Sequence, residues 1–128
     1  MAGTVTLSEK GRRDGLLCYS IDWLSDASGV VSGTISQIEG TIERIVYLPN
    51  TESGTQPDDN YDVTLADENG LDVLRGTGAN LDEANASQVV TTGGDASVLP
   101  YATCGLLTLA IAGAGATNTG TIRIYFRR

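Results

Sequence analysis

The sequence predicts an all-β protein, a single antiparallel β-sandwich or barrel of jelly-roll-like form, with about eight short strands. Short segments in which apolar and polar residues alternate recur along the 128-residue chain, as half-buried strands require. Turn-forming residues separate these segments at intervals of roughly ten residues. The composition agrees, because 16 glycines and many threonines and serines favour strands and turns over helices.

The first half of the chain contains the clearest strand patterns. Residues 4–7 alternate and are expected to form an edge strand. In residues 17–23 every second side chain is large and apolar, which predicts a strand with one buried face. Turn residues follow at 25–29. Residues 30–39 predict a weaker strand interrupted by a glycine, and residues 41–48 are apolar enough to form a central strand.

A long loop and a hairpin are expected next. Residues 49–60 contain two prolines, a glycine and several acidic residues, so they predict a surface loop. Residues 61–76 predict a β-hairpin around an Asn-Gly pair. A two-residue turn would place Asp67 opposite Asp72, and like charges in that position destabilise a hairpin. We therefore expect a loop one residue longer that ends in a G1 bulge at Gly70, the alternative being a cation between the two carboxylates.

One short helix is expected in residues 80–86, because Asn80 can cap it and the acidic side chains that follow favour the positive helix N-terminus. Strand character then resumes in residues 88–92, 98–103, 106–112 and 122–127. Pro100 restricts the second of these segments to an edge strand or a loop.

The chain is expected to form one domain over residues 15–128, preceded by an N-terminal arm over residues 1–14. Glycines in the arm allow it to reach a neighbouring subunit, and the alternative is that it folds back on its own sheet. Twelve apolar side chains on the inward strand faces are expected to form the core: Leu17, Tyr19, Ile21, Trp23, Ile45, Val63, Leu65, Leu107, Leu109, Ile122, Ile124 and Phe126.

The reactive side chains predict that this protein is not an enzyme and needs no cofactor. The chain has no histidine, so Ser-His-Asp and Cys-His arrangements are excluded. No glycine motif for phosphate binding occurs in a suitable context. We expect no metal site; a cation, if one binds, would use carboxylates of the long loop or the hairpin. These candidates are Asp58, Asp59, Asp62, Asp67 and Asp72.

The net charge and the apolar segments restrict the kinds of partner and environment that are expected for this protein. A net charge of −8 and a pI near 4.2 argue against nucleic acid. No apolar segment approaches the ~20 residues of a membrane-spanning helix, and no secretory signal is visible. Cys18 and Cys104 lie in apolar segments and are expected to be free buried thiols, with a disulfide left open. Basic residues gather near both termini, at Arg12 and Arg13 and at Arg123, Arg127 and Arg128. If the termini are adjacent, these residues form a positive spot that can dock an acidic neighbour; the alternative is that they are solvated chain ends.

Several turn motifs are similar to those of small structural proteins of tailed bacteriophages. The similarity runs from about residue 20 to residue 127. It is carried by the segments DWLSDASG at 22–29, RIVYLP at 44–49, QPDDNYDV at 56–63, DENGLDVL at 67–74 and GTGAN at 76–80, and ends with LTL at 107–109 and the Gly/Ala loop before the last strand.

The resemblance implies a non-enzymatic head decoration (cement) protein, made in the host cytoplasm and located on the outer capsid surface of the virion. Its partner would be the major capsid protein. Independently of the resemblance, residues 4–7 form an edge strand with no charge or proline to protect it, so we expect a homo-oligomer that covers this edge. We expect a homotrimer, because it matches the local three-fold positions of a capsid lattice. The alternatives are a tail component or a tail-fibre-type carbohydrate-binding module; the latter requires exposed aromatic residues in a groove. Candidate contact residues are Thr4, Val5, Thr6, Leu7, Arg12, Arg13, Pro49 and Pro57.

Overall fold

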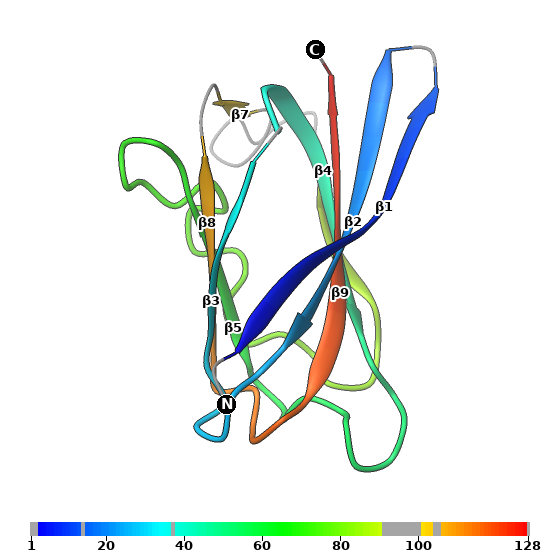
Figure 1. Ribbon diagram of the computed structural model, residues 1–128, viewed down its shortest axis with the longest axis vertical. Helices are drawn as coiled ribbons and strands as arrows, with labels where there is room; N and C mark the ends of the chain where they lie inside the picture. The colour runs from blue at the N-terminus through cyan, green and yellow to red at the C-terminus, as the bar shows by residue number, and fades with distance from the viewer. Residues whose placement is uncertain (1–2, 14, 37, 91–100, 104–105, 128) are drawn as a thin grey trace.

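A computed structural model describes residues 3–127, apart from 14, 37, 91–100 and 104–105. The described residues form nine strands in two antiparallel sheets and contain no helix (Figure 1). In particular, this part of the chain has no helix able to cross a membrane. The predicted all-β fold is confirmed, as a sandwich and not as a closed barrel. The predictions made for Pro100, Cys104 and Arg128 lie outside the described residues.

The larger sheet has six strands and the smaller sheet three. In spatial order, the larger sheet contains β1 (Thr4–Arg13), β2 (Leu16–Leu24), β9 (Thr119–Arg127), β4 (Gly40–Pro49) and β6 (Ser87–Val90), with β7 (Tyr101–Thr103) also paired with β4. The smaller sheet contains β3 (Val31–Ile35), β8 (Leu107–Ala112) and β5 (Asp62–Ala66). In Figure 1 the three strands of the smaller sheet lie together on the left, facing β2, β4 and β9.

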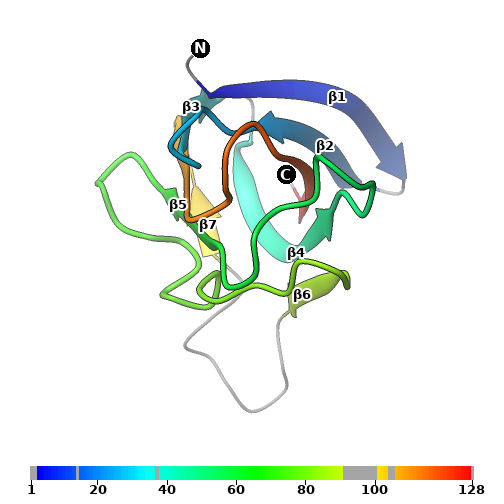
Figure 2. The ribbon, with the colours of Figure 1, turned by 90° about the horizontal axis from the view of Figure 1, so that it is seen from below.

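The strands pair in the nested order of a jelly roll. The outermost pair is β2 with β9, the next is β3 with β8, and the third is β4 with β6 and β7. Innermost, β5 and the residue before it meet the segment that follows through two isolated bridges, Ala66↔Asp72 and Tyr61↔Leu81. From β2 to β6, and again from β7 to β9, successive strands alternate between the sheets, so the connecting loops collect at the two ends of the sandwich (Figures 1 and 2).

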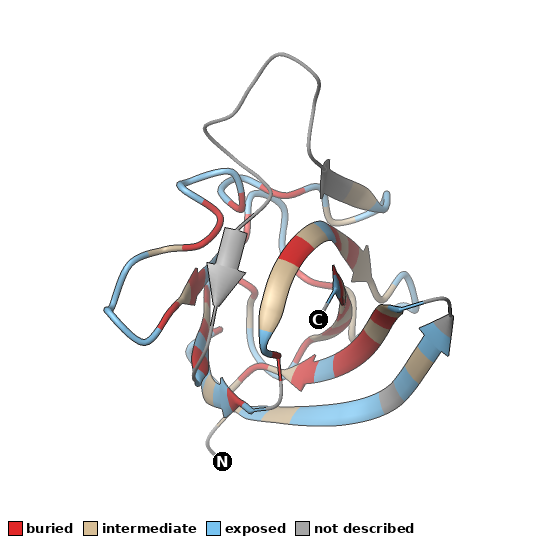
Figure 3. Cartoon of the chain, turned by 90° about the horizontal axis from the view of Figure 1, so that it is seen from above, coloured by how far each residue is buried: buried red, intermediate tan, exposed pale blue. Residues whose placement is uncertain are grey.

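The core lies between the two sheets and contains all twelve side chains predicted for it. Each of the twelve is exposed by 8% or less. Strand β9 shows why the core could be predicted, because its residues alternate between buried and half-buried along almost its whole length. Figure 3 shows the related contrast between two strands, with many buried residues on β2 and mostly exposed residues on β1. The rings of Tyr19 and Phe126 meet edge to face, with centroids 4.9 Å apart. This contact joins neighbouring strands of the larger sheet inside the core.

Residues expected in an N-terminal arm form strand β1 of the protein's own sheet. This strand pairs with β2 over its whole length, so residues 4–13 fold back as the second alternative required. Its first half also packs against β3, where a β-carbon at Gly33 would come within 2.7 Å of Val5 Cγ2. The far end of the β1–β2 hairpin projects beyond the sandwich (Figure 1).

The prediction of a short helix in residues 80–86 is wrong, because this segment is irregular. Asn80 adopts a φ of 55°, which a right-handed helix excludes. Leu81 is buried, and its N–H donates to the carbonyl of Tyr61 at 2.9 Å. Asp82 Oδ1 accepts a hydrogen bond from the N–H of Ala84 at 2.7 Å, which holds a turn and not a helix N-terminus. Pairing of Leu81 with the start of β5 therefore overrides the local helix preference.

The hairpin loop is one residue longer than a two-residue turn, as expected from the repulsion between Asp67 and Asp72. The N–H of Gly70 donates to the carbonyl of Asp67 at 3.0 Å, and the N–H of Asp67 donates to the carbonyl of Leu71 at 2.8 Å. Gly70 has a φ of 80°, whereas Asn69 has none of the positive φ that a type I′ turn needs. The returning arm is not a strand, since it pairs with β5 at one bridge and then enters turns.

Candidate functional site

Most of the carboxylates proposed as cation ligands instead hold loops in place. Asp62 Oδ1 accepts a hydrogen bond from the N–H of Asn80 at 2.8 Å. Asp67 Oδ1 accepts from the N–H groups of Asn69 at 2.8 Å and Leu71 at 3.0 Å. These bonds satisfy backbone donors in turns that have no strand partner.

Asp72 takes the place of a missing strand neighbour for β5. Its Oδ1 accepts from the N–H groups of Leu65 at 3.1 Å and Leu74 at 3.0 Å, and its Oδ2 accepts from the N–H of Gly76 at 3.0 Å. Asp67 and Asp72 are thus each surrounded by N–H donors, an environment that suits an anion and not a metal ligand. The arrangement gives no support to a cation between them.

Asp59 of the long loop lies near two carboxylates that were not among the candidates, those of Asp82 and Glu83. Asp59 lies with Asp82 and Glu83, and one oxygen of each falls within 4.8 Å of the others; among the described residues this is the carboxylate group compact enough for a metal. Asp58 and Asp62 lie outside it. A hydrogen bond with Asp59 raises the pKa of Glu83 above its ordinary value. Sequence reasoning missed this group because Asp82 and Glu83 were assigned to a helix far along the chain.

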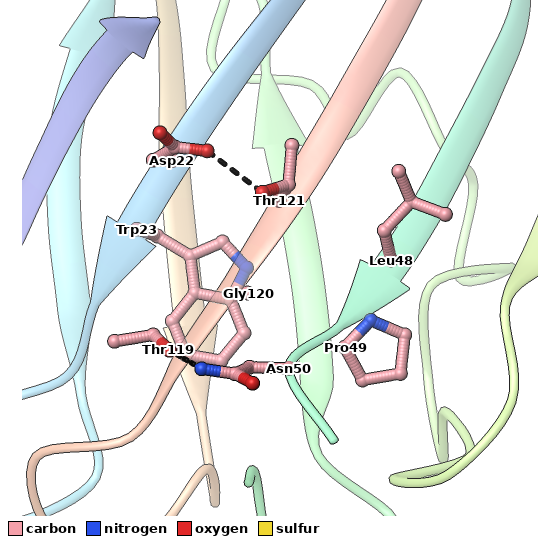
Figure 4. Close-up of a pocket in the computed structure, with 8 residues that line it drawn as sticks. All are labelled: Asp22, Trp23, Leu48, Pro49, Asn50, Thr119, Gly120 and Thr121. Atoms are coloured by element: carbon pink, nitrogen blue, oxygen red, sulfur yellow. Dashed lines mark hydrogen bonds between the residues drawn. The ribbon is translucent and has the colours of Figure 1, made fainter. Parts of the chain in front are cut away.

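A pocket of about 470 Å³ lies at one end of the larger sheet, where β2, β9 and β4 run side by side (Figure 4). Its wall includes Asp22, Trp23, Asn50 and Thr121. The hydroxyl of Thr121 donates to Asp22 Oδ1 at 2.7 Å. Asn50 Nδ2 donates to the hydroxyls of two threonines, and its Oδ1 accepts from the N–H of Glu52. The indole of Trp23 is 2% exposed. The polar groups of Asn50 and the ring of Trp23 are therefore already committed to the fold.

The aromatic residues do not form the exposed platform that a carbohydrate-binding module requires. Five of those in the described part are buried by 96% or more: Tyr19, Trp23, Tyr47, Tyr61 and Phe126. Tyr125 is half-buried, and the guanidinium of Arg44 lies 5.0 Å from its ring centroid. The side chain of Tyr101 lies outside the described residues.

Two buried tyrosines have strongly raised pKa values. Burial raises the pKa of Tyr61 to about 12, and burial raises that of Tyr47 further. Within the described part of the chain, the hydroxyl of Tyr47 is the buried side-chain polar atom without a hydrogen-bond partner. Both phenols therefore stay neutral at physiological pH and contribute to packing.

Outward-facing arginines of β4 and β9 form a surface that we call the basic face, comprising Arg44, Arg123 and Arg127 with Tyr125 between them. Arg123 Nε donates to the hydroxyl of Ser20 at 3.1 Å, and Arg127 Nε donates to Glu43 at 2.8 Å. Register connects this face to the basic residues near the N-terminus, since Arg13 pairs with Leu16 and Leu16 pairs with Arg127. The two terminal basic groups therefore do lie close together.

The residues proposed for oligomer or capsid contact are distributed unevenly. On β1, Thr4, Thr6, Leu7 and Arg12 are exposed and Val5 is half-buried. Pro49 is half-buried, whereas Pro57 is buried and offers no surface to a partner. The side chain of Arg13 lies outside the described residues, and Cys18 is a half-buried free thiol.

Comparison of the chain with protein-family models, with curated proteins and with solved structures found no match.

Proposed function

We propose that this protein is a non-enzymatic virion structural protein, a decoration protein that binds the major capsid protein lattice on the outside of a tailed-phage head. It acts there as a homo-oligomer, a trimer. A three-fold oligomer can match the local three-fold positions of a capsid lattice contact for contact. Many copies then stabilise the head through multiple modest contacts.

The observation that carries the proposal is the role of the residues in the phage-like motifs. Asp26 of DWLSDASG accepts hydrogen bonds from the N–H groups of Ser28 at 2.8 Å and Val30 at 3.0 Å. Asp62 of QPDDNYDV and both aspartates of DENGLD also hold backbone turns. The motifs therefore specify architecture, which is what a protein acting through its surfaces needs.

The topology supports the same class of function by analogy. Jelly rolls form many viral capsid domains, and also lectin domains. The buried aromatic residues favour the structural role over the carbohydrate-binding one.

Purified virions of the phage that encodes this chain test the proposal. We expect mass spectrometry to detect the protein and cryo-electron microscopy to place it on the outer head surface. Heads lacking it should lose integrity at a lower temperature, and adding the purified protein should restore their stability. Absence of the protein from virions contradicts the proposal. Density confined to the tail would support a tail component instead.

A further inference from the structure

The charges of this acidic protein are separated in space. Six of the eight Lys and Arg residues, but three of the sixteen Asp and Glu residues, lie on strands of the larger sheet. The six are Lys10, Arg12, Arg13, Arg44, Arg123 and Arg127. The larger sheet is therefore positive within a chain whose net charge is −8.

The opposite sign collects at one end of the sandwich, which we call the acidic end: residues 25–30, 50–61, 80–86 and 113–118. Hydrogen bonds join these loops, including Ser25 N–H to Asn118 O at 2.8 Å and Asp58 N–H to Ala114 O at 3.0 Å. The loops contain six carboxylates and no Lys or Arg: Asp26, Glu52, Asp58, Asp59, Asp82 and Glu83.

The basic face and the acidic end lie apart along the molecule. Strand β9 begins beside the acidic end and finishes, with Arg127, at the other end of the long axis (Figure 1). Arg44 is aligned with Tyr125 near that same end. Because the two charged surfaces are separate, they cannot neutralise each other within one molecule.

The basic face also has the composition of a contact surface. Arg44 lies over the ring of Tyr125, and the arginines and the ring are presented on the outward side of the sheet. Arginine and tyrosine are enriched among residues that dominate binding energy. Half-buried Val46 and Leu48 continue the outward side of β4 with apolar surface.

We propose that the basic face docks the acidic end of a second copy of this chain. The inference deepens the homo-oligomer part of the proposed function, on which it rests. The surfaces differ, so the contact is heterologous and each copy uses both of them. A one-third turn between neighbouring copies closes three contacts into a trimer, whereas another rotation leaves an open chain or a larger ring.

Sedimentation velocity of the purified protein and of two double variants tests this contact. One variant, Arg44→Glu with Arg127→Glu, removes the basic face; the other, Glu52→Lys with Asp59→Lys, reverses the acidic end. Matched controls are Arg75→Glu and Glu68→Lys, which reverse charges in the hairpin away from both surfaces. Circular dichroism and melting check that every variant is folded.

We expect the wild type and both controls to self-associate, more weakly as salt rises, with the dissociation constant increasing about tenfold between low and high salt. Each double variant should be monomeric. Mixed together, the two double variants offer one wild-type pair of surfaces and one charge-swapped pair, both of opposite sign, so association between the two variants should be restored.

A wild type that is monomeric at low salt would overturn the inference, as would double variants that associate like the wild type or a mixture that remains monomeric. Occupancy of virions is measured separately. A monomeric protein that still decorates heads would refute this contact and leave the proposed function standing. A protein that self-associates but is missing from virions would support this contact and contradict the proposed function.

Discussion

The indole of Trp23 lies directly against the backbone of Gly120 on the neighbouring strand, where a β-carbon would come within 2.6 Å of the ring atom Cζ2. The two residues are paired across β2 and β9. Residue 120 must therefore lack a side chain for the tryptophan to be buried at this end of the core.

Gly120→Ala is expected to lower the free energy of unfolding by about 1–3 kcal/mol, because the added methyl group overpacks the core. The matched control is Gly11→Ala on β1, where the nearest atom to an added β-carbon is 3.8 Å away. Urea denaturation followed by the fluorescence of the single tryptophan measures both. Equal stability of the two variants would contradict the contact.

Tyr47→Phe is expected to raise the free energy of unfolding by about 1 kcal/mol, because it removes a buried hydroxyl that has no hydrogen-bond partner. The aromatic ring and its packing stay in place. The same denaturation assay checks this, with Tyr47→Ala as a control that must destabilise by opening a cavity. A clear loss of stability in Tyr47→Phe would show that the hydroxyl is paired.

Asp72→Ala is expected to lower the free energy of unfolding by about 2–3 kcal/mol. The reason is that the N–H groups of Leu65, Leu74 and Gly76 lose a charged acceptor. Asp72→Asn retains one acceptor oxygen and should recover part of that loss. Amide hydrogen exchange provides a second measurement, since the N–H of Leu65 should exchange faster in the alanine variant. An unchanged exchange rate would argue against the bond to Asp72.

The contribution of Asp26 to stability should be lost in acid. Hydrogen bonds from the N–H groups of Val30 and Ser28 hold the pKa of Asp26 below its ordinary value of 3.8. Because the folded-state pKa is depressed, its contribution is present above the ordinary value and is lost as pH falls through the lowered pKa. The melting temperature of Asp26→Asn should lie below that of the wild type near neutral pH, and the two should converge as the solution is acidified. A constant difference across that range would refute this.

Ionisation of Glu83 should have the opposite effect on stability. Its pKa is raised, chiefly by the hydrogen bond with Asp59, so the ionised form is disfavoured in the folded state. The resulting destabilisation is present above the folded pKa and disappears as pH falls through it. Asp59→Asn should therefore raise the melting temperature near neutral pH and have less effect in acid. An increase that grows towards low pH would contradict the assignment.

The sequence by itself determined the alternation of buried and exposed residues along the strands. All twelve predicted core side chains are buried because a strand repeats every two residues, and that local rule needs no knowledge of partners. It also determined the hairpin loop, since repulsion between Asp67 and Asp72 and the freedom of Gly70 act over a few residues.

Only the tertiary structure decided features that depend on contacts between distant segments. Residues 80–86 were expected to be helical, but pairing of Leu81 with Tyr61 supplies hydrogen bonds and burial that a short helix could not match. The group of Asp59 with Asp82 and Glu83 likewise exists because the bridge between Tyr61 and Leu81 brings two distant loops together. The separation of the basic face from the acidic end exists because strands far apart in the chain lie side by side. Local patterns fix which face of a strand is buried, whereas the order of strands in a sheet fixes which charges meet.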